Sequence, residues 1–452
     1  MATAPPSTQP ATKPSQCSRK RASGGLFVFS VLKGARDEHF TADFAEEYRG
    51  AWRVCRRRTA AHLDQERRPR LRRRRRDQGR RAVLADGNDR DHRGIAQQGN
   101  AARHRGDQCR RRHQGSKIVP IVEDPASDPA TFSEKARKLV VGDKCVSVFG
   151  SYTSASRKAV LPVFERQNNL YWYPTLYEGR ECSKNVIYTG AVPNQQQDEF
   201  VPWLVKKFGK KFYLIGSNYI YPKEENNYCK KLLEKLGGEV VAEEYVPLGH
   251  SEFSSVINKI RSTQPNVIFS TVVGDSVVAL HRQYKAAGLD PEKMPMASLT
   301  TSENEVAAMG GEAAAGHFTS APYFMVHKSP ENEKFVEAYK KRWGADKVTH
   351  FVSEACYFQT YLFKQAVEKL ATSDLTPPNI RDAVKGQEVI APQGKVRIEP
   401  ENLHTWLWPK IAQAKSNGQF EILVEAKEWL KPVPYAAYPG QSCTEKGLVE
   451  KS

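Results

Sequence analysis

Short apolar runs alternate with helical patterns along residues 117–435. The runs "KIVPIVED" (117–124), "CVSVFG" (145–150) and "KFYLIGS" (211–217) are typical of β-strands, and the stretches between them repeat apolar residues with a helical period. "NVIFSTVVG" (266–274) is almost entirely apolar, which predicts a strand buried on both faces. This alternation predicts an α/β fold with doubly wound parallel sheets, and the number of units predicts two lobes.

Local signals mark the ends of several predicted helices. Ser251 is the expected N-cap of one helix, and Ser302 with Glu305 matches a capping box at the start of another. Gly237 and Gly238 suit the C-terminal cap of a third helix.

In parallel sheets, ligands bind beyond the carboxyl ends of the strands. The segments there are rich in Ser, Thr and Tyr and poor in charge: "GSYTSAS" (150–156), "YWYPTLYEG" (171–179), "GSNYIYP" (216–222), "STVVGDS" (270–276) and "SLTTSE" (298–303). Hydroxyls and aromatic walls suit a small, uncharged, polar ligand. Simpler roles stay open, because Ser154 or Asp275 can cap a helix and Thr175 can stabilise a turn. Tyr219 and Tyr221 can be exposed loop aromatics.

The chain lacks the sequence signatures of common enzymes. No GxGxxG follows a strand, and neither a GxxxxGK[ST] loop nor a GxSxG elbow occurs. His250, His281 and His404 are far apart in the sequence and suggest no catalytic pair. We therefore expect neither catalysis nor a cofactor.

The eight cysteines include no CxxC pair and no cluster with histidine. A zinc site is therefore not expected, and buried or unpaired thiols are the simplest interpretation. No apolar run approaches the roughly 20 residues that a membrane span needs.

The net charge of +18 belongs almost wholly to the first quarter of the chain. Residues 1–116 contain 28 Lys and Arg against 12 Asp and Glu, whereas residues 117–452 contain 41 against 39. From Arg53 to Arg112 there are 21 arginines and no lysine, and apolar residues are scarce. This segment cannot form a core, and a genuine arginine-rich arm of this kind would bind RNA or DNA electrostatically.

The folded part resembles the urea and short-chain-amide binding proteins of bacterial ABC transporters over about residues 117–435. The similarity lies in "SYTSASRKAVLPVFE", "WYPTLYEG", "IGSNYIYPKEENN", "VIFSTVVGDS", "ASLTTSE" and "APQGKVRIEPENLHTW". It extends to the cytosolic amide sensor of the same fold, which controls an amidase operon. The resemblance implies a type I periplasmic-binding-protein fold, in which two α/β lobes joined by three crossovers close on a ligand.

By motif position, the resemblance implies ligand-binding residues from both lobes: Tyr152, Ser154, Tyr173, Pro174, Thr175, Tyr219 and Tyr221. Relatives regarded as urea-binding commonly have Trp in place of Tyr152, which favours acetamide, formamide or a similar amide here. Ser151 replaces a cysteine that is usual in the family. The implied partner is an ABC permease and the implied location is periplasmic or extracytoplasmic, although the chain has no convincing signal peptide.

The family begins with a strand and a helix where this chain has arginine-rich sequence. Codons for "DQCRRRHQ" (107–114), read one base later, allow I-N-A-A/G-G-G-I, close to a family stretch "EINAAGG". "DQGRRAVL" (77–84) likewise allows I-K-V-G-V-L-S. We therefore hypothesise that residues 77–114 are a frameshifted reading of the first strand and helix. Without these elements, a central strand is expected to lack a partner, and the chain to fold poorly and bind weakly.

The expected organisation is a sequence of seven segments. Residues 1–76 are disordered or uncertain, 77–116 are the arginine-rich segment, 117–192 form lobe I, 193–322 lobe II, 323–390 the return to lobe I, 391–435 the C-terminal strands of lobe II and 436–452 a tail. The leading functional hypothesis is a receptor that delivers an amide or urea to an ABC permease. The alternatives are a cytosolic amide-sensing regulator and, less strongly, a nucleic-acid binder acting through the arginine-rich segment; an enzyme ranks last.

Overall fold

The computed structural model of the chain describes residues 26–33, 116–371 and 374–443. All of them belong to one of the two units into which the chain divides, and residues 34–115 form the other. The segment of the frameshift hypothesis, 77–114, therefore lies outside the described residues.

The first lobe is built on a five-stranded sheet with the order β2-β1-β3-β4-β5. Its strands are β1 (Leu26–Lys33), β2 (Ser116–Glu123), β3 (Ser147–Gly150), β4 (Leu170–Tyr173) and β5 (Val186–Tyr188). Strands β3, β4 and β5 are parallel, and every residue in them is buried. This is the pattern expected of strands covered on both faces.

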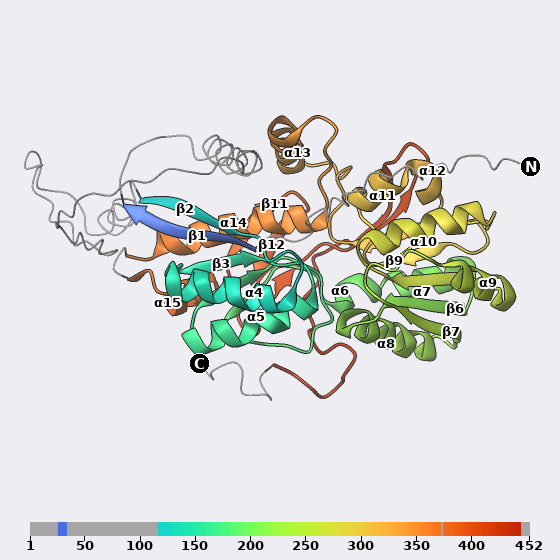
Figure 1. Cartoon of the computed structure of the whole chain (residues 1–452), viewed down its shortest axis with the longest axis horizontal. Helices are drawn as coiled ribbons and strands as arrows, with labels where there is room; N and C mark the ends of the chain where they lie inside the picture. Colours follow the sequence, from blue (N-terminus) through green and yellow to red (C-terminus); the bar gives the residue numbers. More distant parts are fainter. Residues whose placement is uncertain (1–25, 34–115, 372–373, 444–452) are drawn as a thin grey trace, which may run out of the picture. The chain divides into compact units, whose positions relative to one another are not determined.

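Strand β1 corrects two of our expectations about the N-terminal region. It lies between β2 and β3 and pairs antiparallel with both, with Leu26 opposite Glu123 on one side and Gly150 on the other (Figure 1). The central strand β3 is therefore not left without a partner, because residues 26–33 satisfy its free backbone groups. These eight residues fall in the segment for which no regular structure was expected.

The second lobe contains a seven-stranded sheet with the order β15-β14-β10-β9-β8-β6-β7. Its strands are β6 (Lys211–Ser217), β7 (Glu239–Val246), β8 (Val267–Thr271), β9 (Met296–Ser298), β10 (Phe318–Ala321), β14 (Lys410–Ala414) and β15 (Phe420–Glu425). All of β8 is buried, as predicted: Val267 and Phe269 pack in one apolar cluster and Ile268 in another. Strands β6 to β10 are parallel, whereas β14 and β15 are antiparallel additions at one edge.

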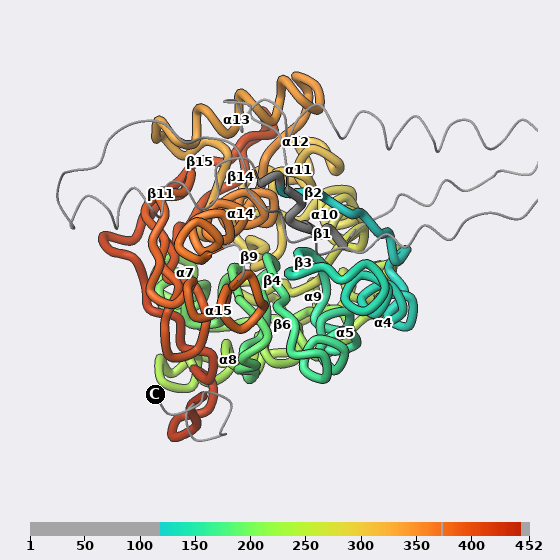
Figure 2. Tube along the Cα trace, turned by 90° about the vertical axis from the view of Figure 1, so that its left-hand side faces the viewer, coloured from blue at the N-terminus to red at the C-terminus, as the bar shows by residue number. Residues whose placement is uncertain are grey.

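Helices cover both faces of each sheet. In the first lobe, α4 (Pro129–Arg137), a π-helical turn (Lys138–Gly142) and α5 (Ser154–Gln167) lie on one face, and α14 (Phe351–Lys369) and α15 (Pro377–Val384) on the other (Figure 2). The remaining helices are α6 (Pro193–Gln197), α7 (Phe200–Phe208), α8 (Ile220–Lys235), α9 (Ser254–Thr263), α10 (Asp275–Ala286), α11 (Glu303–Met309), α12 (Gly311–Ala314) and α13 (Pro330–Trp343).

A small third sheet differs from the expected segment boundaries. It consists of β11 (Glu388–Ala391), β12 (Gly394–Ile398) and β13 (Thr405–Trp406), and a bridge between Tyr188 and His404 links its end to β5. The chain therefore joins the second-lobe sheet at Lys410, rather than at residue 391, because β14 is the first of these late strands to pair with β10.

The helix-end predictions have mixed outcomes. The capping box of Ser302 and Glu305 is confirmed, and Gly237 has a left-handed φ of 64° just past the end of α8. Ser251 is not an N-cap, since α9 begins at Ser254. The side chain of Gln283 donates to the Ser251 carbonyl at 2.7 Å and accepts from the Phe253 amide at 2.7 Å, which holds this segment outside the helix.

Candidate functional site

The predicted ligand-binding residues lie where strands of the two sheets end. Tyr152 and Ser154 follow β3, and Tyr173, Pro174 and Thr175 end or follow β4. Tyr219 and Tyr221 follow β6 at the beginning of α8. Helix α5 contacts helix α8, so the first-lobe and second-lobe residues lie at neighbouring helix ends.

Hydrogen bonds connect the two loops of the first lobe. The Tyr173 hydroxyl donates to the Tyr152 carbonyl oxygen at 3.2 Å, and the Thr175 hydroxyl donates to the Ser151 carbonyl oxygen at 3.0 Å. A Cβ at Gly190 would lie 2.2 Å from the carbonyl carbon of Thr175, so only glycine permits this close approach. Thr175 thus stabilises the loop, which matches the simpler of its two predicted roles.

Ser154 belongs to a buried ionic network and is not a helix cap. Thr153 is the N-cap of α5, accepting from the Ser156 amide at 3.1 Å. The Ser154 hydroxyl donates to Glu178 Oε2 at 2.5 Å and accepts from Arg157 Nη1 at 2.9 Å. Its hydroxyl is therefore already engaged by charged groups.

Arg157 is the centre of this network. Its Nη2 lies 2.9 Å from Glu178 Oε1, and its Nε lies 2.9 Å from Glu181 Oε1. Burial alone would lower the pKa of Arg157, but Glu178 and Glu181 raise it well above its usual value. Burial likewise opposes ionisation of Glu181, yet Arg157 and Lys158 bring its pKa below the usual value. Arg157 thus forms ion pairs with two carboxylates, which compensate the guanidinium charge.

The same guanidinium positions two aromatic rings. Arg157 Cζ lies 5.0 Å from the ring centre of Tyr173 and 4.3 Å from that of Tyr177, within the range of cation–π attraction. The Tyr177 hydroxyl in turn hydrogen-bonds His404 Nε2. Tyr173 is therefore held by two interactions: its hydroxyl donates to the Tyr152 carbonyl, and its ring faces the Arg157 guanidinium.

The two second-lobe tyrosines are not exposed loop aromatics. Tyr219 is half-buried and Tyr221 is 1% exposed, with ring centres 6.2 Å apart. The Tyr221 hydroxyl is buried and has no hydrogen-bond partner within the described part of the chain. Burial raises the pKa of Tyr219, and the phenols of Tyr173 and Tyr152 raise it further, which indicates that tyrosines of both lobes lie near one another.

Sequence reasoning missed Arg157, Glu178 and Glu181. Charged residues on a helix or in a loop usually face solvent, and only the burial of all three distinguishes this network. Asp275 is exposed in the first turn of α10, where Gly274 is the N-cap, so Asp275 is not the N-cap of this helix.

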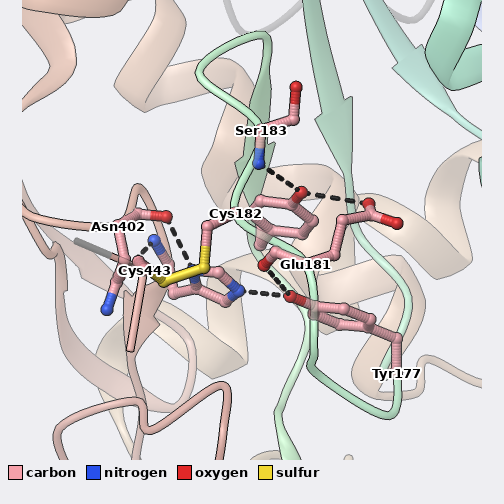
Figure 3. Close-up of a disulfide and its surroundings, with 8 residues drawn as sticks. Tyr177, Glu181, Cys182, Ser183, Asn402 and Cys443 are labelled. Atoms are coloured by element: carbon pink, nitrogen blue, oxygen red, sulfur yellow. Dashed lines mark hydrogen bonds between the residues drawn. A yellow bond between two sulfur atoms is a disulfide. The ribbon is translucent and has the colours of Figure 1, made fainter. Parts of the chain in front are cut away.

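A disulfide corrects our interpretation of the cysteines. Cys182 in the loop after β4 is bonded to Cys443, 261 residues later (Figure 3). Spacing alone could not reveal this pair, because the two residues meet only through the tertiary fold. Cys145, Cys229 and Cys356 are free, and the first two are buried.

The segment that ends at Cys443 contacts both lobes. The Arg180 amide donates to the Pro434 carbonyl at 2.8 Å beside the disulfide. The Tyr438 hydroxyl donates to Glu224 Oε2 at 2.6 Å, and Lys231 Nζ donates to the Ala437 carbonyl at 2.6 Å, both on α8. The disulfide therefore holds the C-terminal segment against the helix that carries Tyr221.

The described ranges contain neither a metal-binding cluster nor a membrane-spanning helix. Among these residues, no group of three or more His, Cys, Asp or Glu is arranged to hold a metal ion. Nor does this part of the chain contain a helix long and apolar enough to cross a membrane.

The profile of the periplasmic binding protein domain matches residues 107–441. The chain belongs to the periplasmic binding protein family. Its relatives include a protein named Leu/Ile/Val-binding protein homolog 6 from Brucella suis biovar 1 (strain 1330), which is 27% identical over 297 residues, or 64% of this chain and 76% of that protein. A 126-residue stretch is 32% identical to a protein named limonene hydroxylase from Geobacillus stearothermophilus, covering 28% of this chain and 22% of that protein.

Solved structures of periplasmic binding proteins share the fold. A solute-binding protein of an ABC transporter from Rhodopseudomonas palustris BisB5, in complex with 3,4-dihydroxy benzoic acid, matches with a TM-score of 0.62 at 21% identity. The match covers 69% of this chain and 86% of that chain. The predicted two-lobed α/β fold is thereby confirmed.

Proposed function

We propose that this periplasmic binding protein is the receptor of an ABC transporter for a small uncharged amide or urea. The observation that carries the proposal is the state of Arg157. A receptor for a carboxylate needs a free cation or a set of directed N–H donors, whereas this guanidinium is paired with Glu178 and Glu181. The surrounding predicted residues supply phenols and hydroxyls, which suit a neutral ligand.

Closure of the lobes would turn binding into a signal. A ligand that contacts Tyr173 of the first lobe and Tyr219 of the second stabilises the closed state over the open one. Exclusion of water strengthens its hydrogen bonds. A permease that recognises only the closed form would then respond to the loaded receptor.

The disulfide favours an extracytoplasmic receptor over a cytosolic sensor. A bond between Cys182 and Cys443 persists in an oxidising compartment and is rare in the reducing cytosol. This observation supports periplasmic location without identifying the transporter.

Calorimetric titration of the purified chain tests the proposal. We expect acetamide, formamide or urea to bind, and leucine and 3,4-dihydroxybenzoate not to compete. Tyr219→Ala should weaken the binding at least about tenfold, whereas Tyr361→Ala, a half-buried tyrosine on α14, should not change it. Binding of either acid in preference to all three neutral compounds would refute the assignment.

A further inference from the structure

Three buried oxygen atoms beside α8 have no hydrogen-bond partner among the residues that the structure describes. They are Oε1 of Gln197, the hydroxyl of Tyr221 and Oε1 of Glu225. Their side chains are 0%, 1% and 0% exposed. Such a group of buried, unsatisfied polar atoms is costly unless another molecule completes its hydrogen bonds.

The backbone brings these three side chains together. Tyr221 and Glu225 are four residues apart, on one face of α8. Gln197 ends α6, in the segment between β5 and β6 that connects the two sheets, and its Nε2 donates to Glu225 Oε2 at 2.5 Å and to the Glu225 carbonyl at 3.1 Å. These two hydrogen bonds fix the orientation of the Gln197 amide and of the Glu225 carboxyl.

Helix α8, which carries Tyr221 and Glu225, contacts α5 of the first lobe. Burial raises the pKa of Tyr221, and the groups that raise it further are Glu225, Tyr219, Tyr152 and Glu178. Glu225 thus lies near Tyr221, and the first-lobe loops that carry Tyr152 and Glu178 lie within electrostatic range.

The chemistry of each atom follows from its bonds. Glu225 is fully buried and no described cation forms an ion pair with it, so the neutral acid is the stable form, consistent with a pKa that burial raises well above the usual value. Its Oε2 already accepts from Gln197, which leaves Oε1 to carry the proton and donate. Gln197 Oε1 can only accept, and the Tyr221 hydroxyl can do either.

We propose that Gln197, Tyr221 and Glu225 bind the amide group of the ligand. Glu225 Oε1–H donates to its carbonyl oxygen, Gln197 Oε1 accepts one of its N–H groups, and Tyr221 completes the contact. This inference rests on the proposed function and adds a reason for ligand selectivity. A primary amide or urea matches the Glu225 donor and the Gln197 acceptor, whereas a carboxylate is repelled by the Gln197 acceptor oxygen.

Substitutions at Glu225 test the donor. Glu225→Gln keeps an acceptor for Gln197 and a donor for the ligand, so acetamide should bind within about threefold of the wild type. Glu225→Leu removes the donor and should weaken acetamide binding at least about tenfold. Glu234→Leu, at an exposed position of the same helix, is the control and should bind like the wild type. Each variant is titrated well below its own melting temperature.

A comparison of acetamide with acetone tests the acceptor. The two molecules have nearly the same shape, but acetone has no N–H group. Gln197→Met removes the N–H acceptor, which only acetamide uses, together with the hydrogen bonds that orient Glu225, on which both ligands depend. It should therefore weaken acetamide binding about tenfold more than acetone binding, so that the preference for acetamide falls. A purely structural role for Gln197 would weaken both ligands equally.

The outcomes separate this inference from the proposed function. If the wild-type chain binds none of acetamide, formamide and urea, the proposed function fails and this inference with it. If acetamide binds but folded Glu225→Leu binds it as well as the wild type does, the inference is overturned. Water molecules alone would then supply the missing hydrogen bonds of the three oxygen atoms. Equal losses in Glu225→Gln and Glu225→Leu would overturn the neutral-donor assignment.

Discussion

Arg157 Nη2 lies 2.9 Å from Glu178 Oε1, and neither side chain is more than 1% exposed. This contact joins the first turn of α5 to the loop after β4; Tyr152 lies two residues before α5, and Tyr173 is the last residue of β4. The site therefore depends on an ionic network whose members cannot be removed singly without leaving a buried charge.

Arg157→Met should destabilise the chain by about 3–5 kcal/mol, because Glu178 and Glu181 would lose their common partner in a buried environment. Lys158→Met is the matched control: Lys158 also contacts Glu181, but its side chain is 44% exposed, so we expect a loss of no more than about 1 kcal/mol. Urea unfolding of both variants provides the comparison, and equal losses would contradict the importance assigned to the buried guanidinium.

Reduction of the disulfide between Cys182 and Cys443 should lower the free energy of unfolding by about 2–5 kcal/mol, since the bond closes a long loop in the unfolded chain. Unfolding is measured with and without a reductant. Cys182→Ala should abolish the sensitivity to reductant, whereas Cys356→Ala, which removes a free thiol, should retain it. A wild-type chain that is insensitive to reductant would show that this bond does not contribute to stability.

Glu303 should make the folded state less stable as the pH rises from about 5 to 8. Burial raises its pKa to about 8, so the folded state retains a proton that the unfolded chain has lost above its ordinary pKa. The free energy of unfolding then falls with pH by at most about 1.4 kcal/mol per pH unit from this group, and the loss ends above pH 8.

Glu303→Gln imitates the protonated acid and retains an oxygen to accept from the Met325 amide. The variant should therefore reduce the pH dependence between pH 5 and 8, as measured by urea unfolding at each pH. The remaining dependence includes Glu354, whose pKa burial also raises to about 8. Identical slopes for variant and wild type would mean that Glu303 is ionised in the folded state.

The frameshift hypothesis for residues 77–114 predicts a specific change in the DNA. Sequencing across the codons for residues 70–120 should show that a one-base shift restores the strand and the "INAAGG"-like helix end. A chain translated from the restored frame should unfold at a higher temperature than the present one, because it has its own first strand for the place beside β3. An intact reading frame would instead make the arginine-rich segment genuine and justify measurements of salt-dependent RNA binding.

The architecture could be predicted, and the candidate site residues assigned to strand ends, because both depend on local patterns. An almost wholly apolar run predicts a buried strand, and this run contains β8. The hydroxyl-rich segments predict strand ends, and they follow β3, β4 and β6. Parallel strands then place their carboxyl ends at one edge, which is why Tyr152 and Tyr173 were expected together.

Other features depended on residues that meet across long separations. The sequence by itself determined the alternation of strands and helices, the two lobes and the tyrosines at the strand ends, because periodicity and composition encode them. Only the tertiary structure decided that Arg157 meets Glu178, that Cys182 meets Cys443 and that residues 26–33 pair antiparallel with β2 and β3. Burial, pairing and pKa depend on neighbours in space, and no local pattern specifies which distant residue becomes the neighbour.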